Sequence, residues 1–216
     1  MKKRILIVIY ALLLCVTASF AWLSDFQEER VGNISVDFQH GALTVVNVDF
    51  DAFLETRDAN GNFVPLGENE KFIFDKKNMV PDAMTPFKIK IKNNSTTESR
   101  KAKLGVAISI DPVEEGEVNI LDMLYLDIVA VSGFRTTDTY HVYVRLSEAD
   151  EIGTDGSGTY YLTIYGDGSE LIIPPFIEDE NPENDYAVLD CSIYFDQEAT
   201  AEYQNKIINT MVFRLE

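Results

Sequence analysis

Strict alternation of apolar and basic residues over positions 87–92 constrains the fold of this chain more than any other feature of its sequence. The six residues read Phe-Lys-Ile-Lys-Ile-Lys. Successive side chains of a β-strand point to opposite faces of a sheet, so this pattern predicts a strand with one buried and one solvated face. Residues 141–146 show the same alternation as His-Val-Tyr-Val-Arg-Leu. Strands of this kind need a second layer to cover their apolar face.

Other segments rich in β-branched and aromatic residues are also expected to form strands. Asn60-Gly61 and Asp167-Gly168 are turn signals between such segments. About eight to ten short strands separated in this way predict an all-β fold, a jelly-roll-like antiparallel β-sandwich with short helical insertions and acidic loops. The expected strands are residues 43–50, 87–92, 103–110, 140–146, 159–165, 171–173, 186–195 and 207–215.

Two segments leave their secondary structure open. The apolar spacing of residues 119–129 fits neither a helix nor a strand cleanly, and residues 199–205 are either one helical turn or a loop. Three acidic stretches, at residues 111–117, 147–158 and 174–185, are expected to be surface loops of one domain.

The first 21 residues have the three parts of a secretory signal peptide. Lys2, Lys3 and Arg4 precede an apolar run at residues 5–16, and small residues follow it. We expect cleavage between Ala21 and Trp22, with an uncleaved membrane anchor as the alternative. The expected organisation is therefore a signal peptide at 1–21, an N-terminal segment at 22–38 and a single β-sandwich domain at 39–216.

The net charge of the chain limits the classes of molecule that it is expected to bind. It has 36 acidic and 18 basic residues, a formal net charge of −18, which argues against nucleic acid and anionic membrane surfaces as partners. We expect contact with a membrane only through the uncleaved signal segment. Removal of that segment, which contains Cys15, leaves Cys191 as one thiol that cannot form an intrachain disulfide, and we expect it to be buried.

The sequence offers little support for catalysis, and we expect no catalytic residues. His40 precedes Gly41 at an expected turn, and His141 opens an expected strand, where a structural role is more common. The sequence has no G-x-S-x-G, H-E-x-x-H or Gly-rich phosphate-binding motif. We therefore expect a protein that is not an enzyme.

One short stretch resembles the start of a calcium-binding loop. Asp58, Asn60 and Asn62 have the spacing of its first three ligands, but the glycine of the sixth position and the glutamate of the twelfth are absent. We expect a turn there and no cofactor, with calcium at this turn or among the acidic loops as the alternative.

Three separated parts of the chain carry a family resemblance. The first is Ala-Trp-Leu-Ser-Asp at residues 21–25 followed by Asp-Phe-Gln-His-Gly-Ala-Leu-Thr-Val at 37–45. The second is Asn-Met-Val-Pro-Asp at 78–82 with the strand and Asn-Asn-Ser at 87–95, and the third is Glu-Tyr-Gln-Asn-Lys at 202–206. Their order resembles the TasA/camelysin family of exported bacterial proteins, which a signal peptidase of the SipW type processes. His40 replaces the usual small residue before the glycine, and the glycines of the second and third motifs are absent.

This resemblance implies a jelly-roll-like sandwich that polymerises by adding its N-terminal strand to the next subunit. The apolar residues of the expected donor segment are Trp22, Leu23, Phe26, Ile34, Val36 and Phe38. Gly32 and Gly41 are the expected hinges. The alternative is that this segment pairs within its own domain.

We therefore expect a secreted structural protein in the extracellular matrix or on the surface of a Gram-positive-type bacterium. It is a fibre subunit or assembly accessory, whose partners are its own copies or a related matrix subunit, with a signal peptidase for processing. A monomeric, calcium-dependent surface-adhesion module is the alternative, followed by a hydrolase that uses acidic residues.

Overall fold

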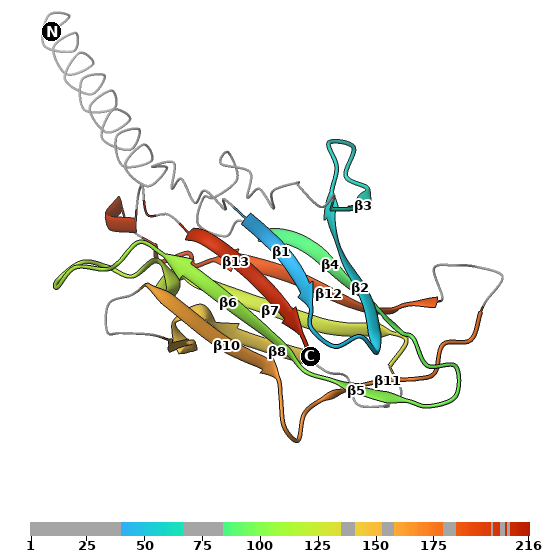
Figure 1. Ribbon diagram of the computed structural model, residues 1–216. Helices are drawn as coiled ribbons and strands as arrows, with labels where there is room; N and C mark the ends of the chain where they lie inside the picture. The colour runs from blue at the N-terminus through green and yellow to red at the C-terminus, as the bar shows by residue number, and fades with distance from the viewer. Residues whose placement is uncertain are drawn as a thin grey trace, which may run out of the picture.

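The computed structural model describes residues 40–66, 84–134, 141–152, 158–178, 185–199, 201–203, 206 and 208–216. These residues form two main sheets that lie in separate layers (Figure 1). The first sheet has the order β1 (His40–Val45), β13 (Ile208–Leu215), β6 (Leu104–Ile110), β10 (Thr159–Tyr165) and β9 (Asp150–Glu151). The second has the order β3 (Phe63–Pro65), β2 (Phe50–Arg57), β4 (Met84–Asn93), β12 (Ala187–Phe195), β7 (Leu124–Ser132) and β8 (His141–Arg145). β11 (Leu171–Ile173) pairs with β5 (Arg100–Ala102) in a small third sheet.

The core lies between the two main sheets because one face of each is apolar. In β12, residues Ala187, Leu189, Cys191, Ile193 and Phe195 are buried, and the residues between them are more exposed. The same alternation places Phe87 of β4 and Phe213 of β13 inside, where their ring centroids lie 5.2 Å apart. This contact joins the two layers directly.

The described strand pairs are antiparallel except for β1 and β13, which run parallel, with His40 opposite Thr210 and Val45 opposite Leu215. The chain crosses repeatedly between the layers, as from β4 through β5 to β6 and from β12 to β13. The expected all-β, jelly-roll-like antiparallel sandwich is therefore confirmed. Its short helical insertions are the 3-10 turns η1 (Ile120–Met123), η2 (Leu146–Glu148) and η4 (Ala201–Tyr203).

Most of the expected strands are present within one or two residues of their predicted ends. The prediction of one strand at residues 43–50 is wrong, because the chain turns at residues 47–50 and passes from β1 in one sheet to β2 in the other. The Asn47 side chain accepts the backbone N–H of Asp49 at 2.9 Å, and the Phe50 N–H donates to the Asn47 carbonyl oxygen at 3.2 Å. These two hydrogen bonds define the turn.

The ambiguous segment 119–129 contains both kinds of structure. The Asn119 side chain accepts the Leu121 N–H at 3.0 Å and begins η1, and β7 starts directly after it at Leu124. The short strands β3, β5 and β9 and most of β2 were not predicted, because they alternate weakly or are only two or three residues long. At residues 147–158 the expected loop includes part of η2 and β9. Within 199–205, where the sequence left a helical turn or a loop open, residues Ala201–Tyr203 form the 3-10 turn η4.

Candidate functional site

The free edges of the two sheets are the first candidate for a functional surface. The first sheet ends at β1 and β9, and the second at β3 and β8. β9 has two residues, both acidic, and β3 has three, one of them Pro65, so length, charge and proline disfavour pairing there. β8 has five residues and ends in the charged Arg145, whereas β1 has six residues, His-Gly-Ala-Leu-Thr-Val, with no acidic residue, lysine, arginine or proline. Among the described residues, β1 is therefore the least protected edge of the two main sheets.

The hydrogen bonds to β13 determine which backbone N–H and C=O groups of β1 face the free edge. The N–H of Val46 donates to the Leu215 carbonyl oxygen at 2.8 Å, so the backbone at Val46 faces β13. Because backbone groups alternate sides along a strand, Leu43 and Val45 turn their N–H and C=O groups away from β13. The side chains of these two residues are only partly buried, and Val46 and Val48 beyond them are 51% and 89% exposed.

The residues expected to assemble the protein lie mostly before this edge. The cleavage site Ala21–Trp22, the apolar positions Trp22, Leu23, Phe26, Ile34, Val36 and Phe38, and Gly32 lie outside the described residues. Gly41 is described: it is the second residue of β1 and lies opposite Met211. Donor-strand exchange and both hinges therefore stay predictions.

The expected calcium candidates form a turn between β2 and β3. One carboxylate oxygen of Asp58 accepts the N–H of Asn60 at 2.9 Å and that of Asn62 at 2.8 Å. The backbone hydrogen bond from Asn62 is the largest influence on the Asp58 carboxyl and lowers its pKa, with Asn60 acting in the same direction. Gly61 completes the turn with φ of +85°, a conformation that favours glycine. Asp58 thus has the role of a turn-stabilising side chain.

The two histidines and Cys191 lie in three different strands. His40 lies in strand β1, so its predicted turn is wrong, since the strand already begins there. His141 opens β8 as expected and its Nε2 lies 2.7 Å from an Asp127 carboxylate oxygen. Cys191 is buried in the core as expected, and burial raises the pKa of its thiol well above the usual value.

A second candidate surface lies on the outer face of the six-stranded sheet. We call it the tyrosine face, defined by Met84, Tyr125, Asp127, His141, Tyr143, Arg145 and Tyr194. Strand register brings these residues together, because Met84 pairs with Tyr194, Tyr194 with Tyr125 and Tyr125 with Arg145, while Asp127 pairs with Tyr143 in the next row. The residues come from β4, β7, β8 and β12, which are widely separated in the sequence, so no local sequence motif predicts this cluster.

The three tyrosine rings of this face contact one another, and these contacts restrict their orientations. Tyr125 and Tyr143 are stacked, with centroids 5.2 Å apart and an interplanar angle of 13°, and Tyr194 approaches Tyr143 edge-on at 6.2 Å. The Arg145 guanidinium lies 4.9 Å from the Tyr125 ring centroid, and its Nε donates to the Tyr125 hydroxyl at 2.8 Å. This hydrogen bond raises the pKa of Arg145, and desolvation raises the pKa of the Tyr143 hydroxyl. Tyr143 and Met84 nevertheless remain 58% and 49% exposed.

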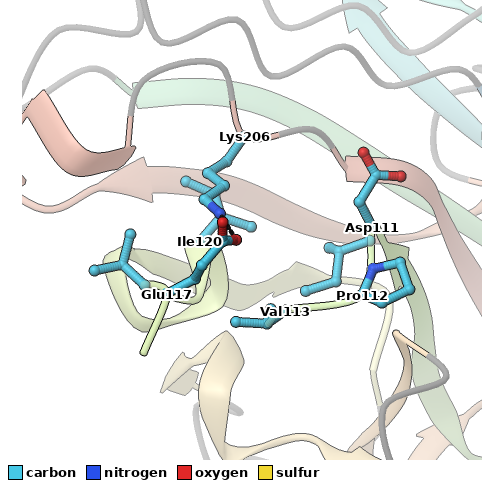
Figure 2. Close-up of a pocket in the computed structure, with 8 residues that line it drawn as sticks. Asp111, Pro112, Val113, Glu117, Ile120 and Lys206 are labelled. Atoms are coloured by element: carbon cyan, nitrogen blue, oxygen red, sulfur yellow. Dashed lines mark hydrogen bonds and ion pairs between the residues drawn. The ribbon is translucent and has the colours of Figure 1, made fainter. Parts of the chain in front are cut away.

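A small pocket of about 200 Å³ lies between η1 and the segment after β6 (Figure 2). Its lining combines apolar and charged side chains: Ile110, Pro112, Val113, Val118 and Ile120 together with Asp111, Glu117 and Lys206. Figure 2 shows Lys206 reaching across to Glu117, with the ammonium 2.5 Å from the carboxylate. The Asp111 carboxylate accepts the Asn209 side-chain N–H at 3.0 Å. These charged groups bind other parts of the same chain, so the pocket is a weaker candidate than either surface.

No group of three or more His, Cys, Asp or Glu side chains within the described ranges could hold a metal ion. No helix among the residues that the structure describes has the length and apolar character needed to cross a membrane.

Comparison with known proteins gives no family. No family model matches the sequence, and no curated protein matches it. Among solved structures, AvmM, described as catalysing macrocyclization in alchivemycin A biosynthesis, matches 80% of this chain and 87% of its own, with 10% identity and a TM-score of 0.36. The GH31 CBM32-2 structure bound to GalNAc matches 67% of this chain and 74% of its own, with 16% identity and a TM-score of 0.25. Neither likeness is close enough to carry a functional argument.

Proposed function

We propose that this chain is an exported structural protein of a bacterial cell surface or extracellular matrix, and that it assembles by strand addition. In this proposal it is a fibre subunit or an assembly accessory of the TasA/camelysin type, and it has no catalytic activity. A signal peptidase cuts between Ala21 and Trp22. The freed segment 22–38 then adds a strand to another copy or to a related matrix subunit.

The observation that carries the proposal is the open edge of β1. Strand addition requires main-chain N–H and C=O groups that face away from the sheet, and Leu43 and Val45 supply them in β1. In the two main sheets, the other three edges formed by described strands are shorter or carry charges or proline, features that hinder edge-to-edge pairing. Among these four edges, β1 is therefore the favoured place for an incoming strand to bind.

The position of β1 in the chain supports the same proposal. Segment 22–38 is followed in the sequence by residue 39 and then by His40, the first residue of the edge strand β1, so the expected donor segment is joined to that strand by a single residue. A segment that starts at the edge of one subunit and pairs with the edge of the next makes a head-to-tail contact, and repetition of such a contact gives a filament when the rotation does not close a ring.

The experiment compares a chain that begins at Trp22 with a matched chain that begins at Gly41, by electron microscopy and size-exclusion chromatography. We expect filaments or large oligomers only from the chain with the intact segment. Monomers from both chains, with and without calcium and at acid pH, would contradict the proposal and favour the monomeric adhesion module.

A pair of proline variants tests the edge itself. Val45→Pro removes an outward-facing N–H of β1 and should abolish assembly while the sandwich stays folded. Val48→Pro is the control, because Val48 is the second residue of the turn at 47–50, a position that accepts proline. Equal assembly of both variants would show that the β1 edge is not the acceptor.

A further inference from the structure

We infer that the tyrosine face is a binding site for a neutral polysaccharide, a role that is separate from strand-mediated assembly. The inference rests on three properties of this face: an exposed Tyr143 ring in contact with the Tyr125 and Tyr194 rings, flanking groups that both donate and accept hydrogen bonds, and local balance of charge.

The ring arrangement provides a stacking surface. Tyr143 lies on a regular strand and is 58% exposed although Tyr125 stacks on it and Tyr194 meets it edge-on. The C–H groups of a pyranose ring pack well on such an exposed aromatic face. Because the contacts with Tyr125 and Tyr194 already restrict the Tyr143 side chain, little rotational entropy is lost when a ligand binds.

Polar side chains flank the exposed Tyr143 ring on the same face of the sheet. His141 and Arg145 lie two residues to either side of Tyr143 on the same face of β8, and Asp127 lies beside it on β7. These side chains contribute ring nitrogens, guanidinium N–H groups and carboxylate oxygens. An aromatic surface with a few placed polar groups is the common composition of a small-molecule or glycan site.

The charges of this face are paired, which favours a neutral ligand. The His141 Nε2 lies 2.7 Å from Asp127, and an Arg145 terminal nitrogen lies 4.0 Å from Asp196. The face therefore presents no excess of positive charge to attract an anionic polymer, and the net charge of −18 repels one. A neutral glycan uses the same donors and acceptors without this penalty.

The test is native gel electrophoresis of the full-length chain through gels that contain a mixed-linkage β-glucan, a galactomannan or a xylan, with polygalacturonate as the anionic comparison. We expect at least one neutral polysaccharide to retard the protein and polygalacturonate to have no such effect. No retardation by any neutral polysaccharide, or equal retardation by polygalacturonate, would overturn the inference.

Variants locate the binding to this face. Tyr143→Ala should weaken binding by about tenfold or more, whereas Tyr143→Phe should keep it within about threefold because the ring remains. Phe63→Ala is the control: Phe63 lies on β3 at the other edge of the same sheet, under Arg57 and Lys88. Unchanged binding by Tyr143→Ala, equal losses in Tyr143→Ala and Phe63→Ala, or a dimer that Tyr143→Ala dissociates in the absence of glycan would each overturn the inference.

Discussion

Replacing Asn93 with alanine should destabilise the sandwich far more than the same change at its neighbour Asn94. Asn93 ends β4 and is 2% exposed. Its Nδ2 lies 2.8 Å from the Glu98 carbonyl oxygen, 3.1 Å from that of Ile173 and 3.0 Å from that of Pro174, and its Oδ1 accepts the Ser95 N–H at 2.9 Å. One amide thus ties the end of β4 to the following turn and to the end of β11.

The size of the effect follows from these contacts. Loss of a hydrogen bond costs about 1 kcal/mol net, and a buried polar group left without a partner costs about 1–3 kcal/mol. For the Ser95 N–H and the carbonyl groups around Asn93, this gives about 3–5 kcal/mol in the free energy of unfolding. The Asn94 side chain is exposed and donates to the Val48 carbonyl oxygen at 3.1 Å, where water can replace the amide. Its loss should cost less than about 1 kcal/mol.

The assay is urea unfolding of the wild-type chain, Asn93→Ala and Asn94→Ala, followed by far-ultraviolet circular dichroism. With an m-value of roughly 2 kcal/mol/M, Asn93→Ala should lower the midpoint by about 1.5–2.5 M. Asn93→Asp should be at least as damaging at neutral pH, because it puts a carboxylate oxygen where the amide donates to carbonyl oxygens. A loss below about 1 kcal/mol for Asn93→Ala, or equal losses for the two alanine variants, would refute the reasoning.

Three further outcomes test other parts of the structure. Asp58→Ala should lower the melting temperature at neutral pH, and the difference from wild type should disappear as the pH falls through the lowered pKa of Asp58, because only the carboxylate holds the turn. Cys191 should fail to react with a thiol reagent in the folded protein and react after denaturation, since burial raises the pKa of its thiol. Phe213→Ala should cost about 3–5 kcal/mol in chemical unfolding, because it empties the inter-sheet contact with Phe87. Thiol modification at the native rate of a free cysteine, a pH-independent Asp58 effect, or a Phe213→Ala cost below about 1 kcal/mol would contradict the respective assignment.

The sequence alone determined the all-β class and the inward face of the long strands. In residues 87–92 the alternation of Phe and Ile with Lys identifies which side chains enter the core, and the structure places Phe87, Ile89 and Ile91 there. This works because the side-chain period of a strand is a local property of the backbone. The same locality explains the prediction of the turn at Asn60-Gly61, where Asp58 and Gly61 supply the hydrogen bonds and the positive φ.

The local sequence pattern did not predict the places where a short turn carries the chain from one sheet to the other. Residues 43–50 form an apolar-rich run, but Asn47 holds a turn, and the two halves enter different layers. Residues 119–129 fit no single period because Asn119 caps a 3-10 turn before β7 begins. In both cases one asparagine side chain competes with strand formation, and the outcome depends on the neighbouring strands as well as on the residue.

Which residues share a surface depends on the tertiary structure and not on any local sequence pattern. The parallel pairing of β1 with β13 places the first described strand beside the last, and it leaves the N–H groups of Leu43 and Val45 facing outward. Likewise, Tyr125, Tyr143 and Tyr194 become neighbours through the register of β7, β8 and β12. Strand order and register are set by packing across the whole sandwich, between residues far apart in the chain, so periodicity within one segment contains no information about them.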